Sequence, residues 1–187
     1  MRVHSWYNER SKGKEKKNME KLIIIRGNSG SGKTAAAGML QKKLGPNTMR
    51  ISHDMVRMEI LHVWGKEGAE RSLPLMTELM RYGRRNSEFT IIEGILPYSD
   101  YNPLFEAALG EYGRENIFAY YYDISFEETL RRHMTKPNRD EFGEEDMRRW
   151  WQEKDYLKNI EETIFVEEIS LEEAVEKIYS DVFSGNP

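Results

Sequence analysis

The residues with the clearest chemical meaning form one run of eight, Gly27-Asn28-Ser29-Gly30-Ser31-Gly32-Lys33-Thr34, which has the G-x-x-x-x-G-K-[ST] spacing of a phosphate-binding loop. Glycines adopt backbone angles that other residues avoid, so successive N–H groups in such a loop point at a polyphosphate. The Lys33 ammonium can reach the β- and γ-phosphates, and the Thr34 hydroxyl can bind the Mg²⁺ that bridges them. The run therefore predicts a site for a nucleoside triphosphate with Mg²⁺. We expect ATP, although no base-reading motif in the sequence separates it from GTP.

The residues on either side of this run have the pattern that such a loop requires. Leu22 to Ile25 is a continuous apolar stretch, typical of a strand that is buried on both faces. A helix is expected from about Gly32 to Gly45-Pro46, where a glycine and a proline end it. The glycines thus occupy a turn between a strand and a helix, and the helix N-terminus adds partial positive charge.

A carboxylate follows the second predicted strand, which spans Met49 to Ser52. Asp54 comes just after that strand and opens a predicted helical stretch from Met55 to Val63. Open α/β sheets bind ligands outside the carboxyl ends of their strands, where a carboxylate can accept the proton of an attacking hydroxyl. The alternative is that Asp54 caps the helix, a role compatible with the first. Arg57, one turn later, is the cation that we expect to bind an anionic or polyhydroxyl substrate.

The third predicted strand, Phe89 to Gly94, also carries a carboxylate near its end. Glu93 lies where such a group can hold Mg²⁺ or orient the substrate beside the phosphate loop. Its side chain is longer than the aspartate usual for the metal role, so contact with the substrate competes with metal positioning. A purely structural role is the third alternative.

Residues 126–158 form the second region with chemical meaning. A capping box at Ser125 opens a helix that carries Arg132 and, one turn later, Lys136, and Arg139 follows in a loop. Phosphoryl transfer uses such cations to neutralise developing charge, and their closure over a nucleotide excludes water. We expect a helical lid in which Arg132, Lys136 and Arg139 contact the nucleotide, with Arg132 acting in catalysis. The alternative is an ordinary pair of amphipathic helices whose charges suit the helix dipole.

Composition excludes several other classes of function. The chain has 187 residues, enough for one α/β domain, and its net charge of −4 provides no overall basic field for nucleic acid or an anionic membrane. Cysteine is absent, which excludes disulfides and thiolate catalysis. The four histidines show no metal-ligand spacing, so no metal other than nucleotide-bound Mg²⁺ is implied. No apolar run approaches the roughly 20 residues of a membrane helix, so a cytoplasmic protein is expected. Residues 1–20 are polar and suggest a flexible leader, or a sequence that begins upstream of the true start at Met19. Residues 21–187 are expected to form the single domain.

Together these motifs resemble the small P-loop kinases of the nucleoside-monophosphate-kinase-like group. The phosphate loop with Ser52-His53-Asp54-Met55-Val56-Arg57 is similar to the branch of zeta toxins, polynucleotide kinases and antibiotic phosphotransferases. Those families keep an aspartate after the second strand as the base, so the resemblance implies that role for Asp54. Their lid arginines correspond to Arg132 and to Lys136, where lysine cannot form the bidentate fork of arginine.

The resemblance implies an α/β fold of three layers, the P-loop NTPase fold, with a five-stranded parallel sheet in the order 2-3-1-4-5 and a helical lid. We therefore expect an ATP- and Mg²⁺-dependent kinase that phosphorylates a hydroxyl of a metabolite, a sugar nucleotide or an antibiotic. A polynucleotide 5′-hydroxyl kinase is less favoured, because it needs a basic groove that the charge balance supports only weakly. A regulatory nucleotide switch or an ATPase without an acceptor is the alternative of another class. The acceptor and the oligomeric state are left open.

Overall fold

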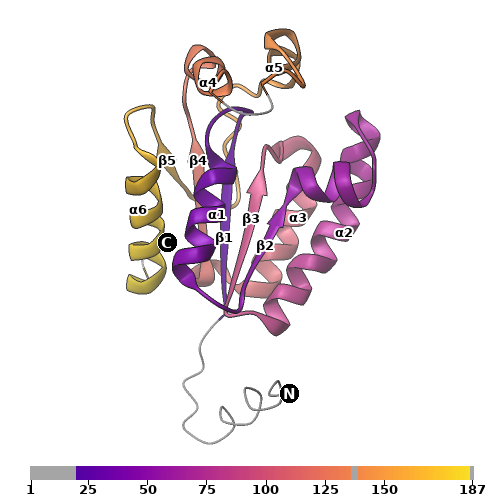
Figure 1. The fold of residues 1–187 in the computed structure, drawn as a ribbon. Coiled ribbons are helices and arrows are strands. Elements are labelled where there is room, and N and C mark those ends of the chain that lie inside the picture. The colour runs from indigo at the N-terminus through magenta and orange to yellow at the C-terminus, as the bar shows by residue number, and fades with distance from the viewer. Residues whose placement is uncertain (1–19, 136–138, 186–187) are drawn as a thin grey trace, which may run out of the picture.

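The computed structural model describes residues 20–135 and 139–185, which form a five-stranded parallel sheet between two layers of helices (Figure 1). The strand order, β2-β3-β1-β4-β5, confirms the expected 2-3-1-4-5 arrangement. Along the chain the elements are β1 (Lys21–Gly27), α1 (Lys33–Leu44), β2 (Thr48–Ser52), η1 (Met55–Ile60), α2 (Gly65–Asn86), β3 (Phe89–Gly94), α3 (Tyr98–Tyr112), η2 (Arg114–Asn116), β4 (Ile117–Tyr122), α4 (Phe126–His133), α5 (Glu144–Trp150), β5 (Glu162–Phe165) and α6 (Leu171–Ser184).

The centre of the sheet is β1, which pairs with β3 on one side and with β4 on the other. Because successive side chains of a strand point to opposite faces, Leu22 and Ile24 enter the core shared with α2 and α3. Ile23 and Ile25 enter the core shared with α1 and α6. All four are at most 1% exposed, and each such burial contributes about 1.5–3 kcal/mol. This double burial holds the end of β1, and the loop after it, in the middle of the sheet.

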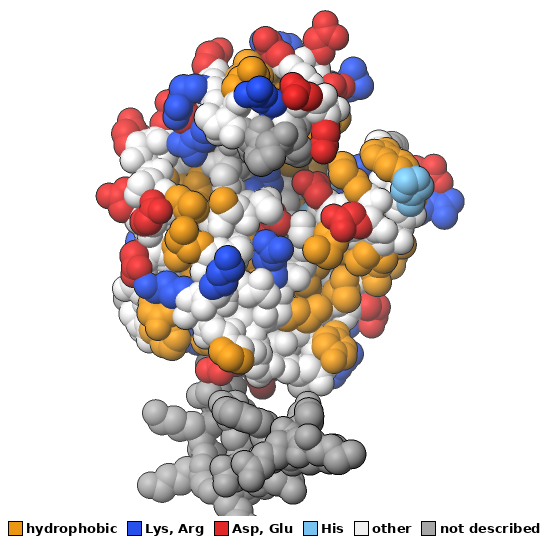
Figure 2. Space-filling view, in the orientation of Figure 1, with side chains coloured by type: hydrophobic (Ala, Val, Ile, Leu, Met, Phe, Trp, Pro, Cys, Tyr) orange, Lys and Arg blue, Asp and Glu red, His pale blue; other side chains and the backbone are white. Residues whose placement is uncertain are grey.

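The carboxyl ends of the parallel strands all lie at one edge of the sheet, beneath α4 and α5 (Figure 1). Strand register brings Glu93 beside Ile25 of β1 and beside Ser52 of β2. The phosphate loop, Glu93 and Asp54 therefore lie along the same carboxyl edge. Figure 2 shows a hollow on this side of the molecule, between the surface over α4 and α5 and the projection at η1 and the start of α2.

The helical stretch after Asp54 is shorter than expected and is of a different helix type. Met55 to Ile60 form a π-helix, whereas the sequence predicted a helical stretch as far as Val63. His62 has a positive φ of 54°, a conformation that cannot continue a right-handed helix. A π-helical turn is rare and is frequently found at functional sites, and this one follows Asp54 directly.

Two predictions fall outside the part of the chain that the structure describes. Residues 1–19 of the expected leader lie there, as does Lys136 of the expected lid. Within the described residues, the helices are all too short or too polar to cross a membrane.

Gly30 is required where α4 packs on the phosphate loop. Its φ is +86°, and a Cβ at this position would lie 2.5 Å from the carbonyl oxygen of Thr129. We expect Gly30→Ala to displace the loop from α4, lowering both the melting temperature and the affinity for a non-hydrolysable ATP analogue. Gly110→Ala is the matched control, since an added Cβ there meets nothing within 4 Å and should stabilise α3 by about 0.5–1 kcal/mol. Thermal unfolding and calorimetry test this, and wild-type values for Gly30→Ala would contradict it.

Candidate active site

The phosphate loop leaves the N-terminus of α1 without a side-chain cap. Gly32 occupies the N-cap position with φ 101°, and the first turn of the helix carries no acidic residue. The unpaired N–H groups of a helix N-terminus and its dipole favour an anion. The Ser31 hydroxyl, also in this loop, is buried and has no hydrogen-bond partner within residues 20–135 and 139–185. The loop thus presents donors of the kind that a phosphate would satisfy.

Thr34 and Glu93 meet beside this loop. The Thr34 hydroxyl donates a hydrogen bond of 3.0 Å to Oε2 of Glu93. Glu93 is 1% exposed, and its other oxygen, Oε1, is buried with no hydrogen-bond partner among the described residues. A buried carboxylate oxygen in this state is costly unless a cation or a donor binds it. Hydroxyl and carboxylate oxygens are hard ligands, so this pair fits the Mg²⁺ of a bound nucleotide.

Lys33 lies in the same loop and is itself buried. Its ammonium donates a hydrogen bond of 3.0 Å to the carbonyl of Asn28, at the start of the loop. Burial lowers the pKa of His53, which follows β2, and the charge of Lys33 adds a smaller contribution in the same direction. The phosphate-loop lysine and the residues beside Asp54 therefore belong to one electrostatic environment.

Asp54 occupies the N-cap position of η1, but its side chain makes no capping hydrogen bond. The carboxylate is 54% exposed, at the carboxyl edge. No hydrogen bond of Asp54 therefore supports the alternative that it caps the helix. Its role as proton acceptor stays a prediction. Arg57 extends toward the start of α2, where it donates to the carbonyl of Gly65 at 3.2 Å. Its Nε is buried without a partner.

The structure brings one of the predicted lid cations to the phosphate loop. Arg132 donates to the carbonyl of Ser31 at 2.9 Å, to the carbonyl of Glu167 at 3.0 Å and to the carboxylate of Glu128 at 2.6 Å. Arg139 is placed differently, since its guanidinium is half-exposed and lies 3.9 Å from Asp140. The three bonds of Arg132 fix it against the loop backbone. The contacts that the structure describes for Arg139 lie within its own segment, with His133 and Asp140.

Two residues that the sequence analysis did not single out tie the loop to the segment after α5. Arg26, at the end of β1, is fully buried and donates to the carbonyl of Leu96 and to the carboxylates of Asp155 and Glu162. Gln152 exchanges two backbone hydrogen bonds of 2.8 Å with the side chain of Asn28. A lone arginine after four apolar residues and before the first loop glycine was the available signal for Arg26.

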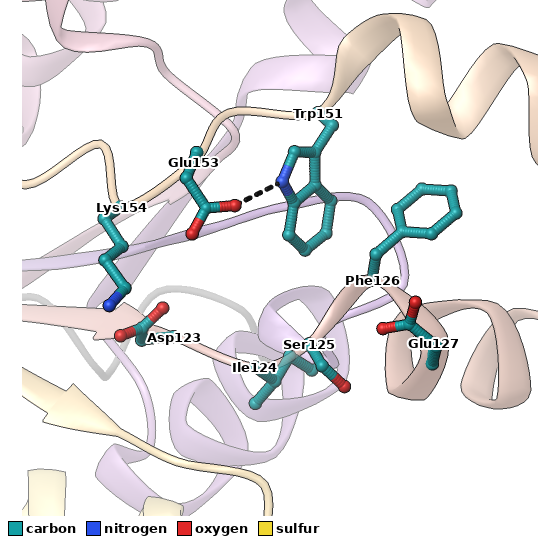
Figure 3. Close-up of a pocket in the computed structure, with 8 residues that line it drawn as sticks. All are labelled: Asp123, Ile124, Ser125, Phe126, Glu127, Trp151, Glu153 and Lys154. Atoms are coloured by element: carbon teal, nitrogen blue, oxygen red, sulfur yellow. Dashed lines mark hydrogen bonds between the residues drawn. The ribbon is translucent and has the colours of Figure 1, made fainter.

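A separate pocket of about 410 Å³ lies where the chain enters α4 and leaves α5 (Figure 3). Its walls come from residues 123–127 and from Trp151, Glu153 and Lys154, not from the phosphate loop. Glu153 accepts a hydrogen bond of 3.0 Å from the Trp151 indole, and Phe126 packs edge-on against that ring. This pocket therefore borders both ends of the α4–α5 region and lies apart from the predicted chemistry.

The family model described as Zeta toxin matches residues 5–77, a stretch that contains the phosphate loop, Asp54 and Arg57. None of the curated proteins compared with the sequence matches it. Many solved structures do match, and their titles identify several as kinases. Together with the observed sheet order, these matches confirm the predicted resemblance to P-loop kinases.

Three of these structures illustrate the likeness. A gluconokinase from Sinorhizobium meliloti superposes with a TM-score of 0.65 at 14% identity, covering 89% of this chain and 93% of its own. The APS kinase CysC of Mycobacterium tuberculosis, in complex with AMPPNP and APS, gives 0.60 at 18% identity over 89% and 98%. A tunicamycin resistance protein from Deinococcus radiodurans gives 0.58 at 16% identity over 88% and 96%. At these identities the likeness establishes the fold.

Proposed function

We propose, for a chain with the fold of the P-loop kinases, that it transfers the γ-phosphoryl group of ATP to a hydroxyl of a small molecule. The supporting observation is the convergence at one carboxyl edge of a phosphate loop, a buried Glu93 with an unsatisfied oxygen, and a half-exposed Asp54. A nucleotide switch or an ATPase would also use the phosphate loop and a carboxylate that holds Mg²⁺. The exposed carboxylate of Asp54 is the group that transfer to an acceptor hydroxyl adds.

In this proposal each group has a distinct task. The loop N–H groups, the α1 N-terminus and Lys33 bind the triphosphate, and Mg²⁺ held by Thr34 and Glu93 would neutralise phosphate charge. Asp54 takes the proton of the acceptor hydroxyl while the oxygen of that hydroxyl forms a bond to the γ-phosphorus. The bond from that phosphorus to the β–γ bridging oxygen breaks, and ADP leaves.

Arg132 has a supporting part in this scheme. It is fixed on the outside of the phosphate loop by its bonds to Ser31 and Glu167, so its remaining N–H groups can face a bound nucleotide. Glu128 pairs with Arg131 and Arg132, which lowers the pKa of this carboxyl to about 2 and keeps it charged. Helices α4 and α5 stand over the carboxyl edge, the position that a lid requires (Figure 1).

The surroundings of Asp54 favour a small acceptor over a polynucleotide. Residues 54–71, which form η1 and the start of α2, carry four acidic and three basic side chains. A polynucleotide groove needs an excess of cations to bind successive phosphates. The acids Glu59, Glu67 and Glu70 are exposed here and would repel a phosphate backbone.

Incubation with γ-labelled ATP and Mg²⁺ tests the proposal. The acceptors are gluconate, APS, tunicamycin, a metabolite extract and an oligonucleotide with a free 5′-hydroxyl, with mass spectrometry to identify products. We expect a labelled small molecule that requires the protein. Labelled free phosphate alone across the whole panel would overturn the proposal in favour of a nucleotide switch or an ATPase. Label on the oligonucleotide would instead indicate a polynucleotide kinase.

A further inference from the structure

His53 is a buried imidazole that immediately precedes the carboxylate of Asp54, and it has a role in none of the steps above. Its side chain is 3% exposed, and its Nδ1 lies 3.7 Å from Oδ1 of Asp54. On the other side of the ring, Nε2 lies 2.5 Å from the hydroxyl of Tyr101 in α3. That hydroxyl is in turn 2.7 Å from the hydroxyl of Ser72 in α2. Helices α2 and α3 and the segment between β2 and η1 thus contribute to one chain of polar groups that ends at Asp54.

The imidazole is fixed in place, whereas the carboxylate beside it can move. Tyr101 packs edge-on against the His53 ring, with centroids 4.9 Å apart and an interplanar angle of 86°. Gly94 of β3 lies so close that an added Cβ would be 2.4 Å from Cβ of His53. Asp54, by contrast, is 54% exposed and has no capping hydrogen bond. A small rotation of Asp54 would therefore shorten the 3.7 Å gap to hydrogen-bond length without moving His53.

The charge state of the ring limits where its proton can be. Burial lowers the pKa of His53 to about 4, an effect that Asp54 partly offsets and that the charges of Arg57 and Lys33 reinforce. The neutral ring has a single N–H. If that N–H were on Nε2, the lone pair of Nδ1 would face the Asp54 carboxylate and remain buried without a donor. With the N–H on Nδ1, Ser72 donates at 2.7 Å to Tyr101 in place of its longer 3.3 Å bond to the carbonyl of Ala69. Tyr101 then donates to Nε2, and Nδ1–H faces the carboxylate.

We propose that His53, held as its Nδ1–H tautomer by Tyr101 and Ser72, is a positioning residue that donates to one oxygen of Asp54 and directs the other at the acceptor hydroxyl. The proposal presupposes the kinase activity inferred above. The proton that leaves the acceptor goes to Asp54, and His53 gains and loses none. Its contribution is to the orientation of the base, so it should affect turnover more than binding.

Two substitutions at His53 separate the two ends of the ring. In His53→Gln the side-chain amide can still form a hydrogen bond with Tyr101, but the N–H that donates to Asp54 is lost. In His53→Asn the side-chain NH₂ can remain near the position of Nδ1 and donate to Asp54. With labelled ATP as donor and the acceptor that the panel identifies, we expect His53→Gln to lower kcat about tenfold or more with an unchanged KM for ATP. His53→Asn should recover most of this loss. Equal losses in both variants, or wild-type turnover in His53→Gln, would overturn the proposal.

Tyr101→Phe provides a second variant that preserves the packing of the aromatic ring. It removes only the hydroxyl that fixes the tautomer, so turnover should fall less than in His53→Gln while the melting temperature shows whether the fold is retained. A loss of stability with no change in kcat would mean that the polar chain is only structural, and the positioning role would be excluded.

Nitrogen-15 NMR of the imidazole tests the tautomer without any catalytic assay. His53 is assigned by the signal that disappears in His53→Gln, and we expect its Nδ1 to be protonated and its Nε2 unprotonated near neutral pH. A protonated Nε2 would refute the proposal even if the protein is a kinase. Conversely, absence of phosphoryl transfer to every acceptor of the panel, together with a protonated Nδ1, would refute the kinase function and leave the hydrogen-bond chain to Asp54 established.

Discussion

Replacement of Asp54 by asparagine is expected to lower phosphoryl transfer by a factor of about 10²–10⁴, the usual contribution of a general base. The amide has nearly the shape of the carboxylate but cannot accept the proton of the acceptor hydroxyl. Because Asp54 is 54% exposed and caps no helix, its loss should leave the melting temperature and the affinity for ATP near wild type. Turnover with the acceptor found in the screen, and calorimetric titration with an ATP analogue, are the two measurements.

Lys33→Ala is the matched comparison for this variant, because it removes a group from the other half of the proposed site. Lys33 belongs to the phosphate loop, so its loss should weaken nucleotide binding as well as abolish transfer. The contrast distinguishes a base from a phosphate ligand. Retention of transfer in Asp54→Asn would remove Asp54 from the mechanism, whatever the effect of Lys33→Ala.

Replacement of Arg26 by alanine is expected to lower the free energy of unfolding by about 3–5 kcal/mol, as removal of one partner from a buried ion pair does. The guanidinium is fully buried and forms ion pairs with Asp155 at 2.5 Å and with Glu162 at 2.9 Å. Glu162 is 2% exposed, so without Arg26 its carboxylate would be charged and unpaired in the protein interior. Urea denaturation at neutral pH measures the loss.

The pH dependence of this variant gives an independent check. Burial, opposed by the charge of Arg26, already raises the pKa of Glu162 above its ordinary value. Removal of Arg26 should raise it further, and a raised carboxyl pKa costs stability as the pH rises through it. The deficit of Arg26→Ala should therefore shrink as the pH falls and Glu162 takes up a proton.

Arg81→Ala is the control, since Arg81 also contacts two carboxylates, those of Glu78 and Glu111, but is 38% exposed. Ion pairs at the surface contribute about 0.2–1 kcal/mol. If Arg26→Ala costs no more than Arg81→Ala, the buried cluster does not hold the segment after α5 in place, and its proximity to the phosphate loop would need another explanation.

The sequence by itself determined the parts of this protein that depend on near neighbours in the chain. The phosphate loop follows from eight adjacent residues, and β1 from four apolar ones before them. The predicted capping box at Ser125 is confirmed in one half, because its hydroxyl accepts from the N–H of Glu128 three residues later. The other half is wrong: the Ser125 N–H donates to Glu167, and the Glu128 carboxylate pairs with arginines of the same helix. The sheet order was also expected, though through resemblance to P-loop kinases and not from the local pattern. The roles of Asp54, Glu93 and Arg132 remain predictions.

Only the tertiary structure decided which distant groups meet. Thr34 bonds to Glu93 across 59 positions of sequence, Arg132 to Ser31 across 101, and Arg26 to Glu162 across 136. His53 was visible in the sequence but its partners Tyr101 and Ser72 were not. A turn or a capped helix forms from interactions within a few residues, which a pattern can reveal. Contacts between strands and helices depend on the order of the sheet and on how each face packs, and no spacing along the chain encodes them.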